Sequence, residues 1–233
     1  MTEEKEEIVK RKVVVPGEVI IKGEDYLPGD WTTKEGDSII ANKFGLAEES
    51  GRLVKVIPLS GGYIPRRGNI VIGQVKDITF NGWIVDIDAH YQAFLSLNEF
   101  PRFISKNDLA EHYTIGDLLI AQVLGIKRTA VDLTLKSRGL GKIEKGLIIR
   151  VNSNKVPRVI GKGGSMVNLI KTETNCEISI GQNGIIWIKG ENVEDELKAK
   201  KVILFVTEKS ASEGLTEKVE KFLKENKTSG DKN

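Results

Sequence analysis

The feature that most limits how this 233-residue chain can fold is a short glycine-rich segment, Gly161-Lys162-Gly163-Gly164. The apolar pair Val159-Ile160 precedes it, and Met166, Leu169 and Ile170 follow it at helical spacing. Glycine has no Cβ, so the backbone can approach a sugar-phosphate strand closely, while a lysine and the amides at a helix N-terminus can meet phosphates. The segment therefore predicts a tight link between two short helices. Either it contacts a nucleic-acid backbone, or it is only an interhelical turn.

The spacing of these glycines does not fit two other known types of glycine-rich loop. A P-loop needs its lysine after the last glycine and then Ser or Thr, whereas Lys162 lies between glycines and Ser165 follows one. A dinucleotide-binding loop needs a further glycine at a fixed offset within a βαβ unit, and neither is present. A nucleotide cofactor is therefore not expected.

The elements around the glycines predict an ordered module over residues 141–228. Residues 147–151, 176–180 and 185–189 read as strands, and 193–209 and 215–225 as helices. The order strand, helix, glycine loop, helix, strand, strand, helix is that of a type I KH domain, which clamps an RNA backbone with its glycine loop. The predicted RNA contacts here are Arg158, Gly161, Lys162, Gly163 and Gly164.

The charge distribution favours the same region. The formal net charge is only +2. Residues 141–190 contain 8 basic and 3 acidic side chains, a balance of +5, whereas residues 13–65 contain 5 and 8, a balance of −3. Residues 66–140 contain 9 and 8, or +1. A localised basic excess is typical of a face that binds a polyanion.

Two β-rich regions precede the KH-like module. Residues 13–65 contain short β-branched runs separated by Pro-Gly and Gly-Asp pairs, which predicts a small N-terminal β domain after a charged, flexible tail at 1–12. Residues 66–140 predict strands at 70–76, 83–87, 93–97, 118–126 and 130–135, with a helical or irregular insert at 103–109. Five strands with that insert suit an OB barrel. A second flexible tail is expected at 229–233.

The barrel region resembles the RNA-binding domain of ribosomal protein S1. The resemblance is carried by the segments 73–78, 82–87, 93–95, 116–123 and 133–136. Most such domains have aromatic side chains at the positions of Asn81 and Ile84 and a histidine at that of Ser96, to stack bases. This sequence lacks all three, and strand alternation predicts that Trp83 is a core residue. The remaining candidates for RNA contact on the barrel are Lys127, Arg128, His90 and Tyr91.

No catalytic or metal site is expected. The single cysteine, Cys176, cannot supply a cysteine-rich zinc site, and His90 and His112 have no second ligand at a convincing spacing. Asp86 and Asp88 share a strand face and are expected to be solvated. No apolar stretch is long enough for a membrane span or a secretory signal, so a cytoplasmic location without membrane contact is expected.

The three regions together resemble the RNA-binding cap subunit of the archaeal exosome, the ribosomal RNA-processing protein 4 family. The most family-like stretches are 14–18, 61–65 and 89–95. The resemblance implies a non-catalytic subunit, three copies of which sit on a hexameric ring of two types of RNase PH-like subunit. It further implies that the cap feeds the 3′ ends of single-stranded RNA to phosphorolytic sites in the ring. We expect the domain at 13–65, which is negatively charged, to dock on the ring.

Two alternatives stay open at this point, and a third does not fit the chain. A structural scaffold would stabilise the ring and make little RNA contact of its own. A transcription antitermination-type factor would follow its S1-type barrel with two KH modules, and only one is found. Polynucleotide phosphorylase would place KH before S1 and would need catalytic domains, for which the chain has no room.

Overall fold

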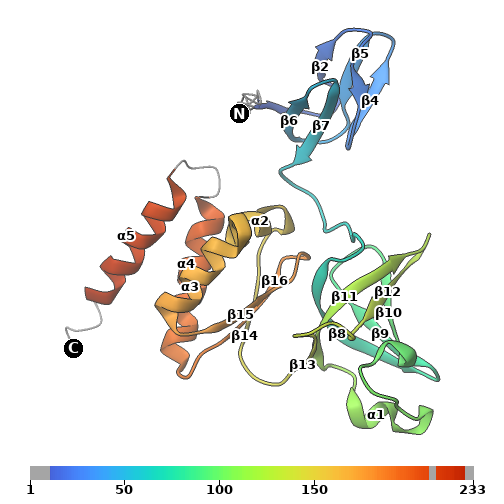
Figure 1. The fold of residues 1–233 in the computed structure, drawn as a ribbon, viewed down its shortest axis with the longest axis vertical. Coiled ribbons are helices and arrows are strands. Elements are labelled where there is room, and N and C mark those ends of the chain that lie inside the picture. Colours follow the sequence, from blue (N-terminus) through green and yellow to red (C-terminus); the bar gives the residue numbers. More distant parts are fainter. Residues whose placement is uncertain (1–10, 210–213, 229–233) are drawn as a thin grey trace, which may run out of the picture. The chain divides into compact units, whose positions relative to one another are not determined.

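The computed structural model describes residues 11–209 and 214–228, and the chain divides into two compact units, residues 1–61 and 62–233 (Figure 1). The predicted tail at 229–233 and most of the one at 1–12 lie outside the described residues. Among the described residues, no helix is long and apolar enough to cross a membrane.

The first unit contains two small sheets. One has the order β1-β6-β7-β3, and the other has the order β2-β5-β4. The strand bounds are Arg11–Val14 (β1), Val19–Lys22 (β2), Leu27–Pro28 (β3), Thr32–Glu35 (β4), Ser38–Ala41 (β5), Gly45–Ser50 (β6) and Leu53–Pro58 (β7). The β-branched runs of the sequence, at 13–15, 19–21, 38–40 and 53–57, coincide with β1, β2, β5 and β7. The strands β3, β4 and β6 were missed because they are short or rich in Glu, Thr and Gly, so that sheet pairing rather than propensity forms them.

The core of this unit is small. Val14, Ala41, Ala47 and Val56 are buried, and Ile20 and Trp31 pack against them. The predicted β domain is therefore a separate folded body with its own core.

The second unit begins with a closed barrel. Its strands are Ile70–Thr79 (β8), Gly82–Asp86 (β9), Gln92–Ser96 (β10), Leu118–Ile126 (β11) and Ala130–Thr134 (β12), and Gly141–Ile143 (β13) extends the sheet beyond β11. The sheet order is β12-β10-β9-β8-β11-β13, and β12 also pairs with β11. That pairing closes the barrel, and the prediction of a five-stranded OB fold is confirmed. The insert predicted at 103–109 contains a 3₁₀ turn at Lys106–Asp108, and the short helix α1 (Leu109–His112) begins where the predicted insert ends.

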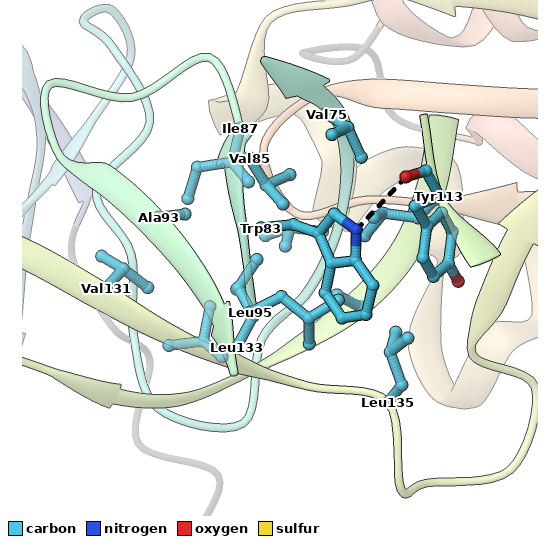
Figure 2. Close-up of a cluster of buried hydrophobic side chains, with 14 of the residues drawn as sticks. Val75, Trp83, Val85, Ile87, Ala93, Leu95, Tyr113, Val131, Leu133 and Leu135 are labelled. Atoms are coloured by element: carbon cyan, nitrogen blue, oxygen red, sulfur yellow. Dashed lines mark hydrogen bonds between the residues drawn. The ribbon is translucent and has the colours of Figure 1, made fainter. Parts of the chain in front are cut away.

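Trp83 lies at the centre of the barrel core, as Figure 2 shows. Its side chain is fully buried, and its indole N–H donates to the carbonyl oxygen of Tyr113 at 3.3 Å. Val85 and Ile87 are buried with it, whereas Asp86 and Asp88 are exposed. The predicted alternation along β9 is confirmed, and Trp83 is not available for base stacking.

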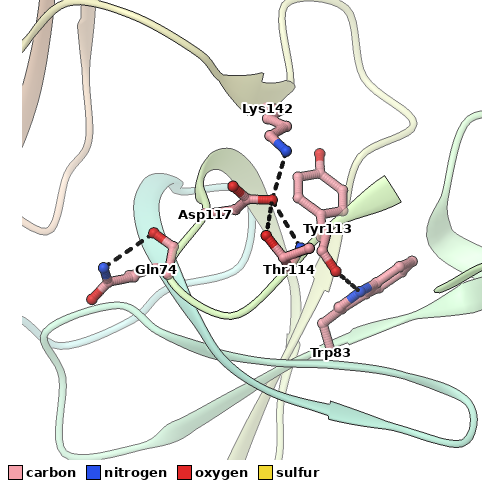
Figure 3. Close-up of polar contacts among 7 residues, drawn as sticks. Gln74, Trp83, Tyr113, Thr114, Asp117 and Lys142 are labelled. Carbon is pink, nitrogen blue, oxygen red and sulfur yellow. Dashed lines mark hydrogen bonds and ion pairs between the residues drawn. The ribbon is translucent and has the colours of Figure 1, made fainter. Parts of the chain in front are cut away.

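A polar cluster fixes the chain just before β11 (Figure 3). Asp117 accepts hydrogen bonds from the backbone N–H and the hydroxyl of Thr114, and pairs with Lys142 on β13 at 2.6 Å. The hydrogen bond from Lys142, followed by that from the Thr114 backbone, lowers the pKa of the Asp117 carboxyl. The cluster holds β13 against the start of β11. It therefore fixes the chain where it leaves the barrel.

The C-terminal part has the predicted order of a type I KH domain. Its elements are Leu147–Arg150 (β14), Val156–Ile160 (α2), Ser165–Thr174 (α3), Glu177–Ile180 (β15), Ile185–Lys189 (β16), Val193–Glu208 (α4) and Leu215–Thr228 (α5). The antiparallel sheet β14-β16-β15 and the four helices enclose one core, and Phe205 on α4 stacks on Phe222 of α5 at 4.5 Å. The fold class is confirmed: a small N-terminal β domain, an OB barrel and a C-terminal KH domain.

The KH domain and the barrel share an interface. Ile72 and Ile120 of the barrel are buried against Ile185 of the KH domain. The turn between β15 and β16 inserts Asn183, whose side-chain amide donates to the carbonyl oxygens of Ile72 at 2.8 Å and Ile87 at 2.9 Å. Its oxygen accepts from the Ile72 N–H at 3.3 Å. The Asn183 amide thus bonds to the backbone of β8 at a point beyond the end of its pairing with β9.

The domain limits drawn from the sequence stay proposals. Tyr63, which precedes the boundary placed near residue 66, is buried in the barrel core and bridges to Ala89. Leu140 and Ile143, at the boundary placed near 141, pack in the interface between barrel and KH domain.

Candidate nucleic-acid interface

The glycine loop turns the chain sharply between α2 and α3. Gly161 ends α2 with φ 75° and ψ 173°, and its N–H donates to the carbonyl oxygen of Pro157 at 2.9 Å. A Cβ at this position would lie 2.7 Å from the backbone nitrogen of Met166, so only glycine fits. Gly163, with φ 60°, is exposed and has open space around it. The loop therefore has one glycine required by packing and one that leaves the backbone accessible.

The start of α3 offers backbone donors next to the loop. Its N-cap is Gly164, which has no side chain to satisfy the first amides of this ten-residue helix. Met166 and Ile170 are buried and fix the helix on the sheet. Amides at such a helix N-terminus, together with the partial positive charge there, favour a phosphate.

The sequence on either side of the loop is basic and contains no acidic residue. Residues 145–172 contain no Asp or Glu. Arg158 on α2 and Lys162 in the loop are exposed, whereas Val159 between them is buried and holds α2 in place. The other basic residues of this segment are Lys145, Arg150, Lys155 and Lys171. The five predicted KH contacts thus lie on one positively charged segment, in which Arg158, Lys162 and Gly163 are exposed and Gly161 and Gly164 are half-buried.

The predicted contacts of the barrel also lie together. Lys127 and Arg128 form the turn between β11 and β12, and His90 and Tyr91 lie in the loop before β10. The parallel pairing of β10 with β12 places Gln92 opposite Ala130, so the loop and the turn meet at one end of the barrel. Lys127 pairs with Asp132 at 2.8 Å, which partly neutralises it.

Sequence reasoning missed two basic residues and one aromatic residue. Arg66 and Arg67 lie in the turn before β8, which hydrogen bonds to Val123 of β11. From the sequence they were placed at the start of the barrel region and were not named as RNA contacts, although the basic doublet was visible. Phe94 lies beside Ile84 in the adjacent strand, and its ring covers Gly82, where a Cβ would be 2.9 Å away.

The outer face of β9 and β10 does not favour a polyanion. Asp86 pairs with Lys76 at 3.6 Å, and Asp77 is placed opposite Ile84. The face also includes Asp132, which neighbours Phe94. Phosphate contacts are therefore better supported at the basic end of the barrel than on this face.

The described residues contain no group of three or more His, Cys, Asp or Glu side chains that could hold a metal ion. Asp86 accepts a hydrogen bond from the Asp88 backbone N–H at 2.9 Å, and His112 packs against Phe100 at 5.1 Å. Cys176 is buried, and burial raises the pKa of its thiol.

Comparisons with known proteins agree with this architecture. Residues 146–205 match the KH domain family. The exosome complex component Rrp4 of Methanothermobacter thermautotrophicus is 40% identical over 92% of this chain and 68% of its own length. For Rrp4 of Thermococcus kodakarensis the identity is 40% over 91% of this chain and 85% of that protein.

A solved structure supports the same relationship. The crystal structure of a candidate exosome complex RNA-binding protein has a TM-score of 0.66 and 31% identity, and the match covers 73% of this chain and 100% of that one. The likeness therefore extends over more than a single domain. On these matches, the chain belongs to the Rrp4 family of exosome complex components.

Proposed function

We propose that this protein is a non-catalytic, RNA-binding cap subunit of an archaeal exosome. It binds single-stranded RNA and passes 3′ ends to a ring of RNase PH-like subunits for degradation and processing. The observation that carries the proposal is the family match, which spans 92% of the chain and includes proteins named exosome complex component Rrp4. The exposed glycine loop and the basic segment around it support RNA binding by the chain itself.

Each part of the chain has a distinct role in this proposal. The KH loop, through Arg158 and Lys162, and the basic end of the barrel contact phosphates. The N-terminal domain docks on the ring, because its balance of −3 disfavours RNA and it exposes apolar side chains suited to a protein contact. The most exposed of these are Leu27, Val13 and Val15, at 56%, 53% and 52%.

The finer assembly also belongs to the proposal. Three copies would cap a hexamer of two ring subunit types, in the cytoplasm and without a cofactor. The three domains would span residues 13–65, 66–140 and 141–228.

A second candidate, a structural scaffold, is favoured by one observation. The β15–β16 turn is held in the barrel by Asn183, so part of the KH surface is used for packing and not for a ligand. Comparing RNA affinity of the isolated chain with that of the ring-bound chain separates the two functions. An RNA-binding subunit binds RNA measurably in both states, whereas a scaffold does not increase the RNA affinity of the ring.

The proposal predicts that the purified chain degrades no RNA. Incubated with phosphate and a labelled single-stranded RNA, it should release no nucleoside diphosphates, because phosphorolysis takes place in the ring. Addition of the ring subunits should start the release. Activity that stays with the chain through further purification, and does not require the ring, would contradict the non-catalytic role.

A further inference from the structure

The chain between β10 and β11 holds one phenylalanine out into solvent. Phe103 is 98% exposed, although the residues on both sides of it are anchored. Phe100 packs on Trp83 of the barrel core, with 6.1 Å between the ring centroids, and Ile104 is buried in the same core. Pro101 further restricts the backbone between these two anchors. The exposure of Phe103 is therefore set by the fold and is not the result of a loose loop.

A second phenylalanine, Phe80, lies in the turn between β8 and β9 and is 77% exposed. The turn is held by the Thr79 hydroxyl, which donates to the carbonyl oxygen of Gly82 at 2.9 Å. The Nζ atom of Lys106 lies 5.8 Å from the centroid of the Phe80 ring. Phe103 is three residues before Lys106, so their Cα atoms are no more than about 11 Å apart. The two phenylalanines thus lie at the same end of the barrel, and grouped exposed aromatic rings are typical of an interaction site.

The charges closest to the two rings are positive. Arg102 is next to Phe103 in the chain, and Lys106 lies at the Phe80 ring. Both cations are exposed, and neither has an ion-pair partner within the part of the chain that the structure describes. Residues 100–107 contain no Asp or Glu. The carboxylates that flank this segment and the β8–β9 turn are Asp77, Asp108 and Glu99, the last of which already pairs with Lys136.

Aromatic rings beside cations suit either the bases of single-stranded RNA or an acidic peptide. The position of the rings favours the peptide. Phe80 is eight residues beyond Ile72, where the KH turn bonds to β8, which is roughly 25 Å of extended strand. The outer face of the barrel beside this path carries the exposed carboxylates of Asp77 and Asp86, which disfavour phosphates. RNA bound at the KH loop and at the basic end of the barrel is therefore not led to these rings.

We propose that Phe80 and Phe103, together with Arg102 and Lys106, bind a short acidic segment of another protein. An apolar side chain of that segment packs on the two rings, and its carboxylates pair with the two cations, of which the arginine can make a bidentate contact. The site goes beyond the proposed function, in which the N-terminal domain contacts the ring and the KH loop and the basic end of the barrel contact RNA. The chain could hold this partner and RNA at the same time, because the two sites lie at different ends of β8.

The test uses the full chain and a phage-displayed library of short random peptides. Selection on the parent should enrich peptides in which several Asp or Glu residues surround an aromatic or large aliphatic one. An enriched peptide, synthesised with a fluorescein label, should bind the Phe80→Ser/Phe103→Ser variant about 30-fold more weakly in fluorescence anisotropy. The fold should be kept because both side chains are exposed, and an unchanged thermal midpoint checks this. The matched control, Val193→Ser/Leu197→Ser, removes two exposed apolar side chains from α4 and should bind the peptide like the parent.

A charge swap tests the two cations. The Arg102→Glu/Lys106→Glu variant should bind the acidic peptide at least about tenfold more weakly. The same peptide with Lys in place of its acidic residues should bind this variant better than it binds the parent. Equal affinity of the acidic peptide for the parent and for this variant would show that the cations take no part, which contradicts the proposed site.

Two further results would overturn the inference. One is that no acidic peptide is enriched on the parent, or that the enriched peptides bind the Phe80/Phe103 variant equally well. The other is that this variant loses affinity only for a labelled oligouridylate, which would make the two rings a base-stacking surface. RNA binding and ring assembly by the parent test the proposed function separately, so a failure of either proposal can be told from a failure of the other.

Discussion

Replacing Lys162 and Gly163 together with Asp should abolish most RNA binding by the chain while leaving its fold intact. The change alters the loop by three charge units, from one positive charge to two negative ones. Each unit near a phosphate costs on the order of 1 kcal/mol, so affinity should fall about 100-fold. The measurement is fluorescence anisotropy with a labelled single-stranded RNA.

The fold should survive because both positions are exposed and the Cβ of residue 163 would have no atom within 4 Å. Asp also tolerates the left-handed backbone of Gly163 better than most residues do. Thr216→Asp/Lys218→Asp makes the same change in charge on the exposed side of α5 and is the matched control. Parental affinity in the Lys162/Gly163 variant, with the thermal midpoint unchanged, would show that the loop is only a turn.

The Asn183→Ala variant should be the most destabilising single polar substitution in the second unit. Asn183 is only 4% exposed, and its amide makes three hydrogen bonds to backbone groups of the barrel. Truncation leaves those groups without partners at the interface, at a cost of about 3 kcal/mol. For a unit of this size, the thermal midpoint should fall by about 6–12 °C.

Calorimetry of the full chain measures this effect. Asn98→Ala, at the exposed residue of the 3₁₀ helix Leu97–Glu99, is the matched control and should change stability by no more than about 0.5 kcal/mol. If Asn183→Ala melts at the same temperature as the control, water replaces the amide without cost, and Asn183 does not fasten the KH domain to the barrel.

Local sequence signals predicted the parts of the fold that depend on neighbouring residues. The burial of Trp83 followed from strand alternation, and the KH order followed from helical and strand periodicity around the glycines. β6 was not predictable in this way, because Glu48 and Glu49 interrupt its apolar pattern and its pairing with β1 and β7 supplies its stability.

The residues of the candidate site were also predicted unevenly, because only some of them are neighbours in the sequence. Its glycine loop is contiguous in sequence, so residues 158–164 could be named together. The turn at 181–184 was also visible, yet the partner of Asn183 is 111 residues away at Ile72, and no local pattern records such a contact. The basic end of the barrel combines segments that meet only through the parallel pairing of β10 with β12.

Strand β8 is shared by both folded modules of the second unit. It pairs with β9 and β11 inside the barrel, and its Ile70 and Ile72 backbone groups bond to the KH turn. The amides of Ile72 and Gln182 can exchange with solvent only when barrel and KH domain separate or β8 opens. We therefore expect the barrel and the KH domain to open together as one foldon. Its most protected amides should include those at the interface between the two domains as well as those in each core.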